Sequence, residues 1–90
     1  MGYWLYVLRC ADDTLYTGIT TDLRRRVTEH QMGQGARYTR GRRPIWLVGA
    51  APYPDRSAAL RAEAAFKRLS RSRKLDRLEE LARTLPANML

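Results

Sequence analysis

Cysteine and lysine are both scarce in this 90-residue chain. The single cysteine, Cys10, excludes an internal disulfide and any site in which several thiolates hold a metal ion. A reducing cytoplasm is therefore the expected compartment. Only Lys67 and Lys74 are lysines, so arginine supplies nearly all of the 17 basic side chains.

Long apolar runs are absent as well. The apolar start of the chain, residues 3–8, is cut off by Arg9 and follows no basic segment, so it lacks the pattern of a secretion signal. No later run approaches the roughly 20 apolar residues that a membrane span needs. We expect a soluble, cytoplasmic protein that does not span a membrane.

Acidic residues are few, since 9 of them face 17 basic ones and leave a net charge of +8. A polyanion is the natural partner of such a surface, and the planar arginine fork suits phosphate because it donates two parallel hydrogen bonds. The alternative is an ordinary solvated basic surface. Binding to a membrane surface is disfavoured, because the arginines are spread over loops and helices without an aromatic-rich apolar helix face.

The first 19 residues have the pattern of a β-hairpin, with two runs of aromatic and aliphatic residues around a turn at 11–14. A register with Tyr6 opposite Gly18 and Leu8 opposite Tyr16 puts both tyrosines on one face as diagonal neighbours. Any even shift of the register keeps them together. The alternative role for these tyrosines is plain packing across the strands.

A first helix is predicted from Leu23 until Gly33, with N-cap oxygens available at residues 20–22. On it Arg26 and His30 lie four residues apart and flank the apolar stripe. The alternative is an ordinary solvated helix face with a structural histidine.

The remaining pattern predicts a basic loop at 33–43, a strand at 45–50 buried on both faces, and two helices beyond Pro52 and Pro54. Asp55 or Ser57 is expected to cap the first of these helices and Ser70 or Ser72 the second. The inward residues are predicted to be Ala59, Ala62, Phe66 and Leu69, then Leu75, Leu78, Leu81, Ala82 and Leu85.

These elements predict one α+β domain over residues 1–86 with a short tail at 87–90. The element order is β-β-α-β-α-α, with helices packed on a three-stranded mixed or antiparallel sheet.

Two further groups of polar residues are candidates for function. Glu63 lies beside the inward stripe of its helix, although a surface pair with Lys67 one turn later is the alternative. The basic loop at 33–43 is predicted to clamp a nucleic-acid backbone and to offer one aromatic ring for stacking. The alternative is a mobile basic loop. Its residues are Arg37, Tyr38, Arg40, Arg42 and Arg43.

The order of these residues resembles the GIY-YIG nuclease superfamily over nearly the whole chain. The two short signatures correspond to Leu5-Tyr6-Val7 and Tyr16-Thr17-Gly18, which depart from the usual pattern in the leading glycine and the central aliphatic residue. The resemblance continues through 18–26, His30, 35–39 and 59–63. It looks like the small stand-alone bacterial branch, which is similar to the nuclease domain of the eukaryotic endonuclease that cuts branched DNA.

The resemblance implies a metal-dependent endonuclease that hydrolyses phosphodiester bonds, with DNA favoured over RNA and branched or damaged DNA among the expected substrates. Tyr6 or Tyr16 would help to deprotonate the attacking water, and Arg26 would hold the scissile phosphate. His30 is a candidate for contact with the phosphate region. Glu63 would hold a single Mg²⁺ or Mn²⁺, and Lys67 would border the site.

A nucleic-acid-binding module that has lost catalysis is the rival function. A binder needs basic residues but has no use for Glu63 beside two tyrosines and Arg26, so their joint presence favours the enzyme. A protein partner that supplies target specificity is also expected.

Overall fold

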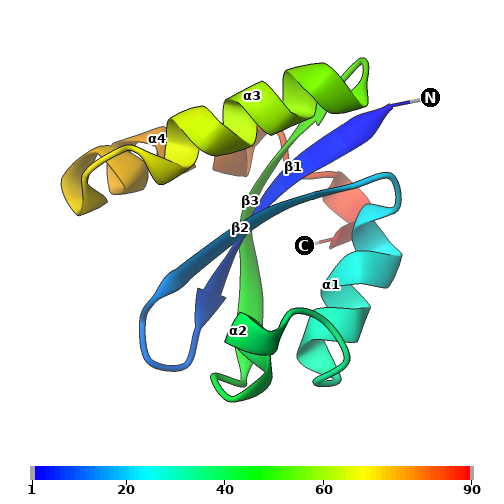
Figure 1. The fold of residues 1–90 in the computed structure, drawn as a ribbon, viewed down its shortest axis with the longest axis vertical. Coiled ribbons are helices and arrows are strands. Elements are labelled where there is room, and N and C mark those ends of the chain that lie inside the picture. Colours follow the sequence, from blue (N-terminus) through cyan, green and yellow to red (C-terminus); the bar gives the residue numbers. More distant parts are fainter. Residues whose placement is uncertain (1, 90) are drawn as a thin grey trace.

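Three antiparallel strands form one sheet in the computed structural model, which describes residues 2–89 (Figure 1). The central strand β1 (Tyr3–Cys10) pairs with β2 (Leu15–Thr20) on one side and β3 (Ile45–Tyr53) on the other. The helices are α1 (Leu23–Gln31), α2 (Arg37–Arg40), α3 (Arg56–Lys67) and α4 (Arg71–Arg83), and a 3₁₀ turn covers Ala87–Met89. The predicted α+β class is confirmed, and the sheet is antiparallel.

The predicted hairpin register is confirmed. Tyr6 pairs with Gly18 and Leu8 pairs with Tyr16. The backbone N–H of Cys10 donates to the carbonyl of Thr14 at 2.9 Å and closes the turn. Because paired residues in an antiparallel ladder share a face, Tyr6 and Tyr16 both project toward α1.

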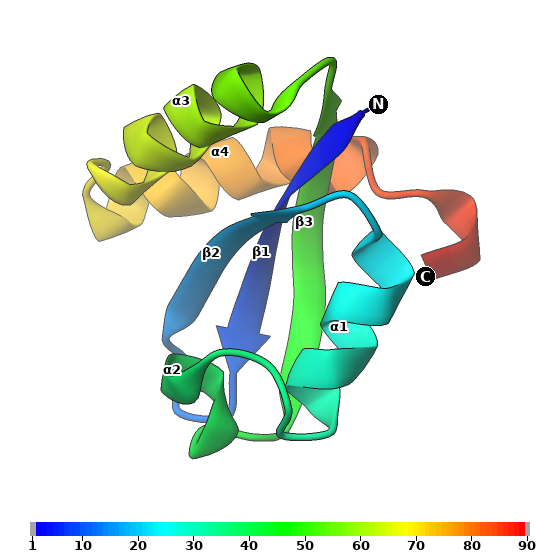
Figure 2. The same ribbon diagram turned by 45° about the vertical axis from the view of Figure 1, so that its right-hand side comes forward.

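The alternation of β1 divides the core into two layers. Tyr6 and Leu8 pack against α1 on one face of the sheet, whereas Leu5 and Val7 pack against α3 and α4 on the other. Figure 2 shows the sheet between α1 and the α3–α4 pair. The face that holds the two tyrosines is therefore closed by the helix that carries Arg26 and His30.

The third strand differs from its prediction at both its end and its faces. β3 continues past residue 50 to Tyr53 and includes Pro52. Trp46 is 45% exposed, so the expectation that the strand is buried on both faces was wrong. Both differences have one cause: β3 is an edge strand, where a proline without an N–H breaks no ladder and an outer side chain meets solvent.

Side-chain caps fix where the helices begin. The carboxylates of Asp22 and Asp55 accept from backbone N–H groups in the first turns of α1 and α3, and the Ser70 hydroxyl does the same for α4. Leu75 and Ala82 are exposed, which contradicts their predicted inward position. α4 crosses an edge strand and buries only a narrow stripe against it.

The C-terminal segment is held to the rest of the fold. The Arg24 guanidinium donates to the carbonyl of Asn88 at 2.7 Å, and Met89 packs against the core layer around Tyr6. The expected tail thus lies against the core as far as residue 89. No helix among residues 2–89 is long and apolar enough to cross a membrane.

Candidate active site

Four aromatic rings from four elements meet over β2. The centroids of Tyr6 and Tyr16 are 6.4 Å apart, and the His30 ring lies 5.7 Å from the first and 5.1 Å from the second. Tyr38 of α2 lies 5.8 Å from Tyr16. The hairpin register, one face of α1 and the short helix α2 together build this cluster.

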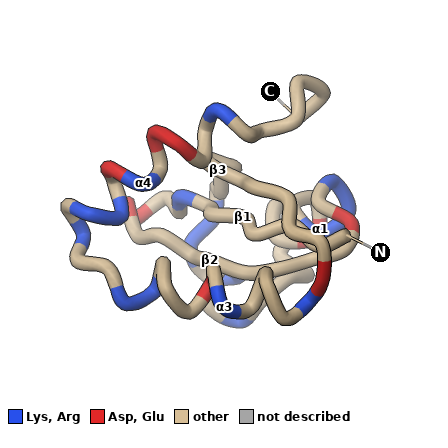
Figure 3. The backbone as a smooth tube through the Cα atoms, turned by 90° about the horizontal axis from the view of Figure 1, so that it is seen from above, with Lys and Arg blue, Asp and Glu red and all other residues tan. Residues whose placement is uncertain are grey.

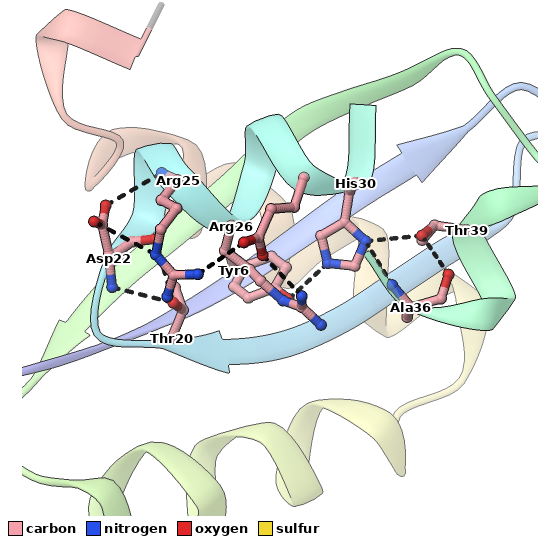
Figure 4. A network of polar contacts seen from close by, with 9 residues as sticks. Tyr6, Thr20, Asp22, Arg25, Arg26, His30, Ala36 and Thr39 are labelled. Carbon is pink, nitrogen blue, oxygen red and sulfur yellow. Dashed lines mark hydrogen bonds and ion pairs between the residues drawn. The ribbon is translucent and has the colours of Figure 1, made fainter. Parts of the chain in front are cut away.

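A chain of hydrogen bonds runs from Tyr6 through His30 into α2 (Figure 4). The Tyr6 hydroxyl is 2.9 Å from Nε2 of His30, and Nδ1 of that ring is 2.8 Å from Oγ1 of Thr39. Thr39 in turn donates to the carbonyl of Ala36 at 3.0 Å. The Thr39 oxygen then accepts from Nδ1–H, which leaves Nε2 to accept the proton of Tyr6.

One contact favours the opposite tautomer of His30, in which Nδ1 is an acceptor: the Ala36 N–H lies 3.4 Å from the same Nδ1. That distance is at the edge of hydrogen bonding, and the 2.8 Å bond to Thr39 is the stronger of the two. The buried phenol proton of Tyr6 also needs an acceptor, and Nε2 of His30, 2.9 Å away, provides it.

Burial keeps both members of the Tyr6–His30 pair uncharged. It raises the pKa of the Tyr6 phenol to about 12. Burial, assisted by the positive charge of Arg26, lowers the pKa of His30 to about 4. Because the pKa of the donor, Tyr6, is far above the pKa of the acceptor, His30, the shared proton stays on Tyr6. Tyr6 is therefore a fixed hydrogen-bond donor in this arrangement.

His30 is completely buried, and this changes the role suggested for it by the sequence. A side chain with no exposed surface does not reach a phosphate in this arrangement. What His30 does is hold the Tyr6 hydroxyl on one side and Thr39 on the other. We assign it as a positioning residue.

The lone histidine should make the stability of the protein depend on pH. Between the unfolded pKa of 6.5 and the folded pKa of about 4, the unfolded chain binds a proton that the folded chain does not. The free energy of unfolding should thus be flat above pH 6.5 and fall by roughly 1.4 kcal/mol per pH unit below it. Urea unfolding from pH 7.5 to pH 5 measures this slope.

His30→Gln is the control for that measurement. The variant keeps every carboxylate titration and removes the only histidine in the chain. Its free energy of unfolding should be nearly constant from pH 7.5 to pH 5. An equal slope in the variant and the parent protein would assign the dependence to other groups.

Two glycines leave the space that the tyrosine and the histidine occupy. A Cβ atom at Gly18 would lie 2.6 Å from the Tyr6 hydroxyl oxygen, and one at Gly35 would lie 2.4 Å from Nδ1 of His30. Neither ring can move away easily, because both are buried. The Tyr6 ring, which packs directly against the backbone of Gly18, thus explains why this position of the second strand is a glycine.

Gly18→Ala should destabilise the fold by about 1–3 kcal/mol, the usual result of adding a methyl group to a packed core. The added methyl group must displace the Tyr6 hydroxyl from His30. Gly41→Ala is the matched control, because a Cβ there meets nothing within 4 Å. Thermal unfolding compares the two variants, and equal melting temperatures would contradict the steric argument.

Arg26 reaches from α1 to the same place and remains partly open to solvent. Its Nη1 donates to the carboxylate of Glu29 at 3.0 Å, and its side chain is 31% exposed. Glu29 also accepts from Arg25 at 2.8 Å, so it is shared between two guanidinium groups. Glu29 was not predicted from the sequence, although its spacing of three residues from Arg26 on a helix was a usable signal.

Glu63 lies on α3, which packs on β1 and β2. Its charge is close enough to contribute to the raised pKa of Tyr6. The side chain is 18% exposed, and its Oε2 forms an ion pair with the Lys67 ammonium at 3.2 Å. The surface pair considered from the sequence is therefore present.

The donor atoms here fit one kind of metal ion. Residues 2–89 contain no group of three or more His, Cys, Asp or Glu side chains placed to hold a metal. A lone, mostly enclosed carboxylate suits a hard cation that keeps most of its water ligands, as Mg²⁺ does. The residues present thus fit a hydrated divalent cation on Glu63.

The segment at 33–43 is more ordered than the predicted loop. It contains the short helix α2, which was not predicted because four residues show no apolar period. Thr39 is fully buried, so the segment is anchored to His30. The Arg42 guanidinium lies 3.9 Å from the centre of the Tyr38 ring and donates to Asp12 at 3.0 Å.

Arg42 is therefore paired with Asp12 and lies against the Tyr38 ring. Arg37, Arg40 and Arg43 of the predicted clamp are exposed. Other basic residues occur on α1, α3 and α4 (Figure 3). Asp12 was not singled out from the sequence, because its partner lies 30 residues away.

Comparisons with known proteins identify the family to which the chain belongs. The GIY-YIG catalytic domain model matches residues 2–76. A UPF0213 protein of Natronomonas pharaonis is 53% identical over 80% of this chain and 85% of its own length. A UPF0213 protein of Cupriavidus necator is 47% identical over 96% of this chain and 94% of its own length.

Two solution NMR structures are also similar. A UPF0213 protein from Bacillus halodurans is 43% identical, with a TM-score of 0.59 over 88% of this chain and 84% of that one. A protein from E. faecalis is 41% identical, with a TM-score of 0.62 over 89% and 85%. Enzymes with this catalytic domain are nucleases that generally use a divalent metal. The chain belongs to the UPF0213 proteins of the GIY-YIG nuclease superfamily, whose substrate is nucleic acid.

Proposed function

We propose that the protein is a divalent-metal-dependent endonuclease that hydrolyses phosphodiester bonds at the aromatic cluster over β2. DNA is the favoured substrate, because the sequence resembles DNA-cutting nucleases. The protein would act in the cytoplasm, where its lone, buried Cys10 stays reduced. A protein partner would select the target.

One observation supports the proposal above the others: the phenols, the arginine and the carboxylate that hydrolysis needs converge from separate elements. Tyr6 and Tyr16 come from the hairpin, Arg26 from α1 and Glu63 from α3. The Tyr6 and Tyr16 ring centroids are 6.4 Å apart, and the pKa of the Tyr6 phenol, which burial raises, also responds to the charges of Arg26 and Glu63. Structural packing alone requires no such convergence of opposite charges.

Each residue has a task in this proposal. Arg26 holds the scissile phosphate and stabilises the charge that develops on it. Tyr16 assists the attacking water, because it is less enclosed than Tyr6 and lines an open pocket. Tyr6 is fixed by His30 and donates a hydrogen bond within the site. A divalent cation on Glu63 would stabilise the leaving oxygen.

The Lys67–Glu63 ion pair favours a second function, a nucleic-acid-binding module without catalysis. In such a module the pair is a plain contact along one helix. It would contribute only about 0.2–0.5 kcal/mol to stability.

Incubation of the pure protein with labelled duplex DNA, branched DNA and RNA separates the two functions. Each substrate is tested with Mg²⁺, with Mn²⁺ and with chelator. The nuclease should cut at least one of them with metal and none in chelator. Binding without cleavage under every condition would support the module instead.

The exposed arginines near Tyr38 should contribute affinity without contributing stability. Changing Arg37 and Arg40 together to Ser should weaken nucleic-acid binding and reduce the log–log salt slope by roughly 0.9 for each phosphate that the protein no longer neutralises. The melting temperature should be unchanged, because both side chains are exposed. Fluorescence anisotropy at several salt concentrations measures the slope.

A matched pair, Arg56→Ser with Arg83→Ser, controls for net charge on α3 and α4. This control should lose less affinity than the α2 double variant. Equal losses would show that the segment attracts nucleic acid through net charge alone.

A further inference from the structure

A small pocket opens beside Tyr16, on the side where the α3–α4 turn faces β2. Its volume is about 240 Å³. It is lined by Leu15, Tyr16 and Thr17 of β2, Tyr38 of α2, Lys67 of α3 and Lys74 of α4. Two ammonium groups and aromatic rings thus share one small space. That combination suits a nucleotide unit, whose phosphate attracts cations and whose sugar and base pack on a ring.

The two lysines of the pocket are engaged differently. The Lys67 ammonium lies 3.2 Å from the Glu63 carboxylate, whereas the Lys74 ammonium lies 5.9 Å from the centre of the Phe66 ring. Lys67 is 56% exposed and Glu63 is 18% exposed, so the lysine is the freer partner. A flexible four-carbon stem allows its ammonium to move toward an anion in the pocket.

The position of Lys67 conflicts with a cation on Glu63. An ammonium group and a divalent cation on one carboxylate repel each other, so they compete for it. Something must draw the ammonium away before the cation binds well. A phosphate in the pocket does this, because it offers Lys67 another anion within its reach.

We propose that the pocket binds the phosphate that neighbours the scissile one, and that this phosphate takes the Lys67 ammonium from Glu63. The inference rests on the proposed function, because the cation site at Glu63 is part of it. Lys74 adds attraction for the phosphate but does not touch Glu63. Nucleic acid and divalent cation therefore bind cooperatively, each raising the affinity for the other through Lys67.

The movement of Lys67 can be tested without any metal. The dissociation constant for a short labelled DNA oligonucleotide is measured in chelator at fixed salt, for a double-mutant cycle of Glu63→Gln and Lys67→Met. Glu63→Gln releases Lys67 to the phosphate, so it should tighten binding about two- to five-fold, the size of an exposed ion pair. In the Lys67→Met background the tightening should disappear.

Lys74→Met is the matched control, since it removes the other ammonium of the same pocket. Glu63→Gln should tighten binding as much in this background as in the parent protein. If Glu63→Gln tightens binding equally in the Lys67→Met and Lys74→Met backgrounds, the effect comes from the change in net charge alone, and the proposal is overturned. Lys67→Met should melt close to the parent temperature, because the Lys67 side chain is 56% exposed and an exposed ion pair contributes little to stability.

Competition for Glu63 is tested with Mn²⁺ alone, by calorimetry without nucleic acid. Lys67→Met should bind Mn²⁺ about two- to five-fold more tightly than the parent protein, and Lys74→Met should bind as the parent does. Equal constants for all three proteins, or no binding to any, would overturn the competition.

Failure of this inference is distinguishable from failure of the proposed function. If the parent protein cuts nucleic acid with Mg²⁺ but the effects of Glu63→Gln and Lys67→Met on DNA affinity are additive, only the role of Lys67 is refuted. A parent protein that cuts nothing refutes the nuclease itself, whatever the cycle shows.

Discussion

Glu63→Gln should reduce cleavage in Mg²⁺ by about 10²-fold or more, the loss that follows removal of one pre-organised group that stabilises charge. Binding of nucleic acid in chelator should survive and become about two- to five-fold tighter. The substitution keeps the size of the side chain and removes the charge on which a single-carboxylate cation site depends. Added metal should then no longer restore turnover. Cleavage rate, affinity in chelator and melting temperature are measured on one preparation.

The control for this variant is Glu80→Gln. Glu80 accepts from Arg77 at 2.9 Å on α4 and is 65% exposed, so it loses an ion pair of the same kind outside the site. Cleavage by this variant should equal that of the parent. If Glu63→Gln also cuts at the parent rate, the pair with Lys67 is an ordinary surface contact and the metal-binding role of Glu63 is wrong.

The sequence predicted those parts of the site that follow from periodicity. A two-residue period placed Tyr6 and Tyr16 on one face of the hairpin, and a spacing of four placed Arg26 beside His30 on a helix. Both patterns act within one element or between adjacent strands. They need no knowledge of how distant elements pack.

The parts that were missed depend on contacts between distant segments. The burial of His30 requires Thr39, which reaches it from a four-residue helix without an apolar period. The attachment of Arg42 to Asp12 joins residues 30 positions apart. The exposure of Leu75 follows from the place of α4 over an edge strand. Such features need the sheet order, which the strand pattern alone does not determine.

The two tyrosines should respond differently to loss of their hydroxyl groups. Tyr16→Phe should lower the turnover rate at saturating substrate by about 10²–10⁴-fold, the usual contribution of a proton-transferring side chain. Its affinity for nucleic acid and its melting temperature should remain close to those of the parent. The reason is that the phenylalanine ring still packs against Tyr38 and His30.

Tyr6→Phe should instead lower stability, because the ring nitrogen of His30 that accepts from Tyr6 would be left buried without a partner. An unsatisfied buried acceptor costs about 1–3 kcal/mol. Its turnover should fall less than that of Tyr16→Phe, since a phenol with a pKa of about 12 keeps its proton at neutral pH and cannot accept one from water. Single-turnover cleavage and urea unfolding of both variants give the four quantities needed. If Tyr6→Phe is stable but does not cut while Tyr16→Phe remains active, the roles proposed for the two tyrosines must be exchanged. If both variants keep full activity, neither phenol takes part in proton transfer.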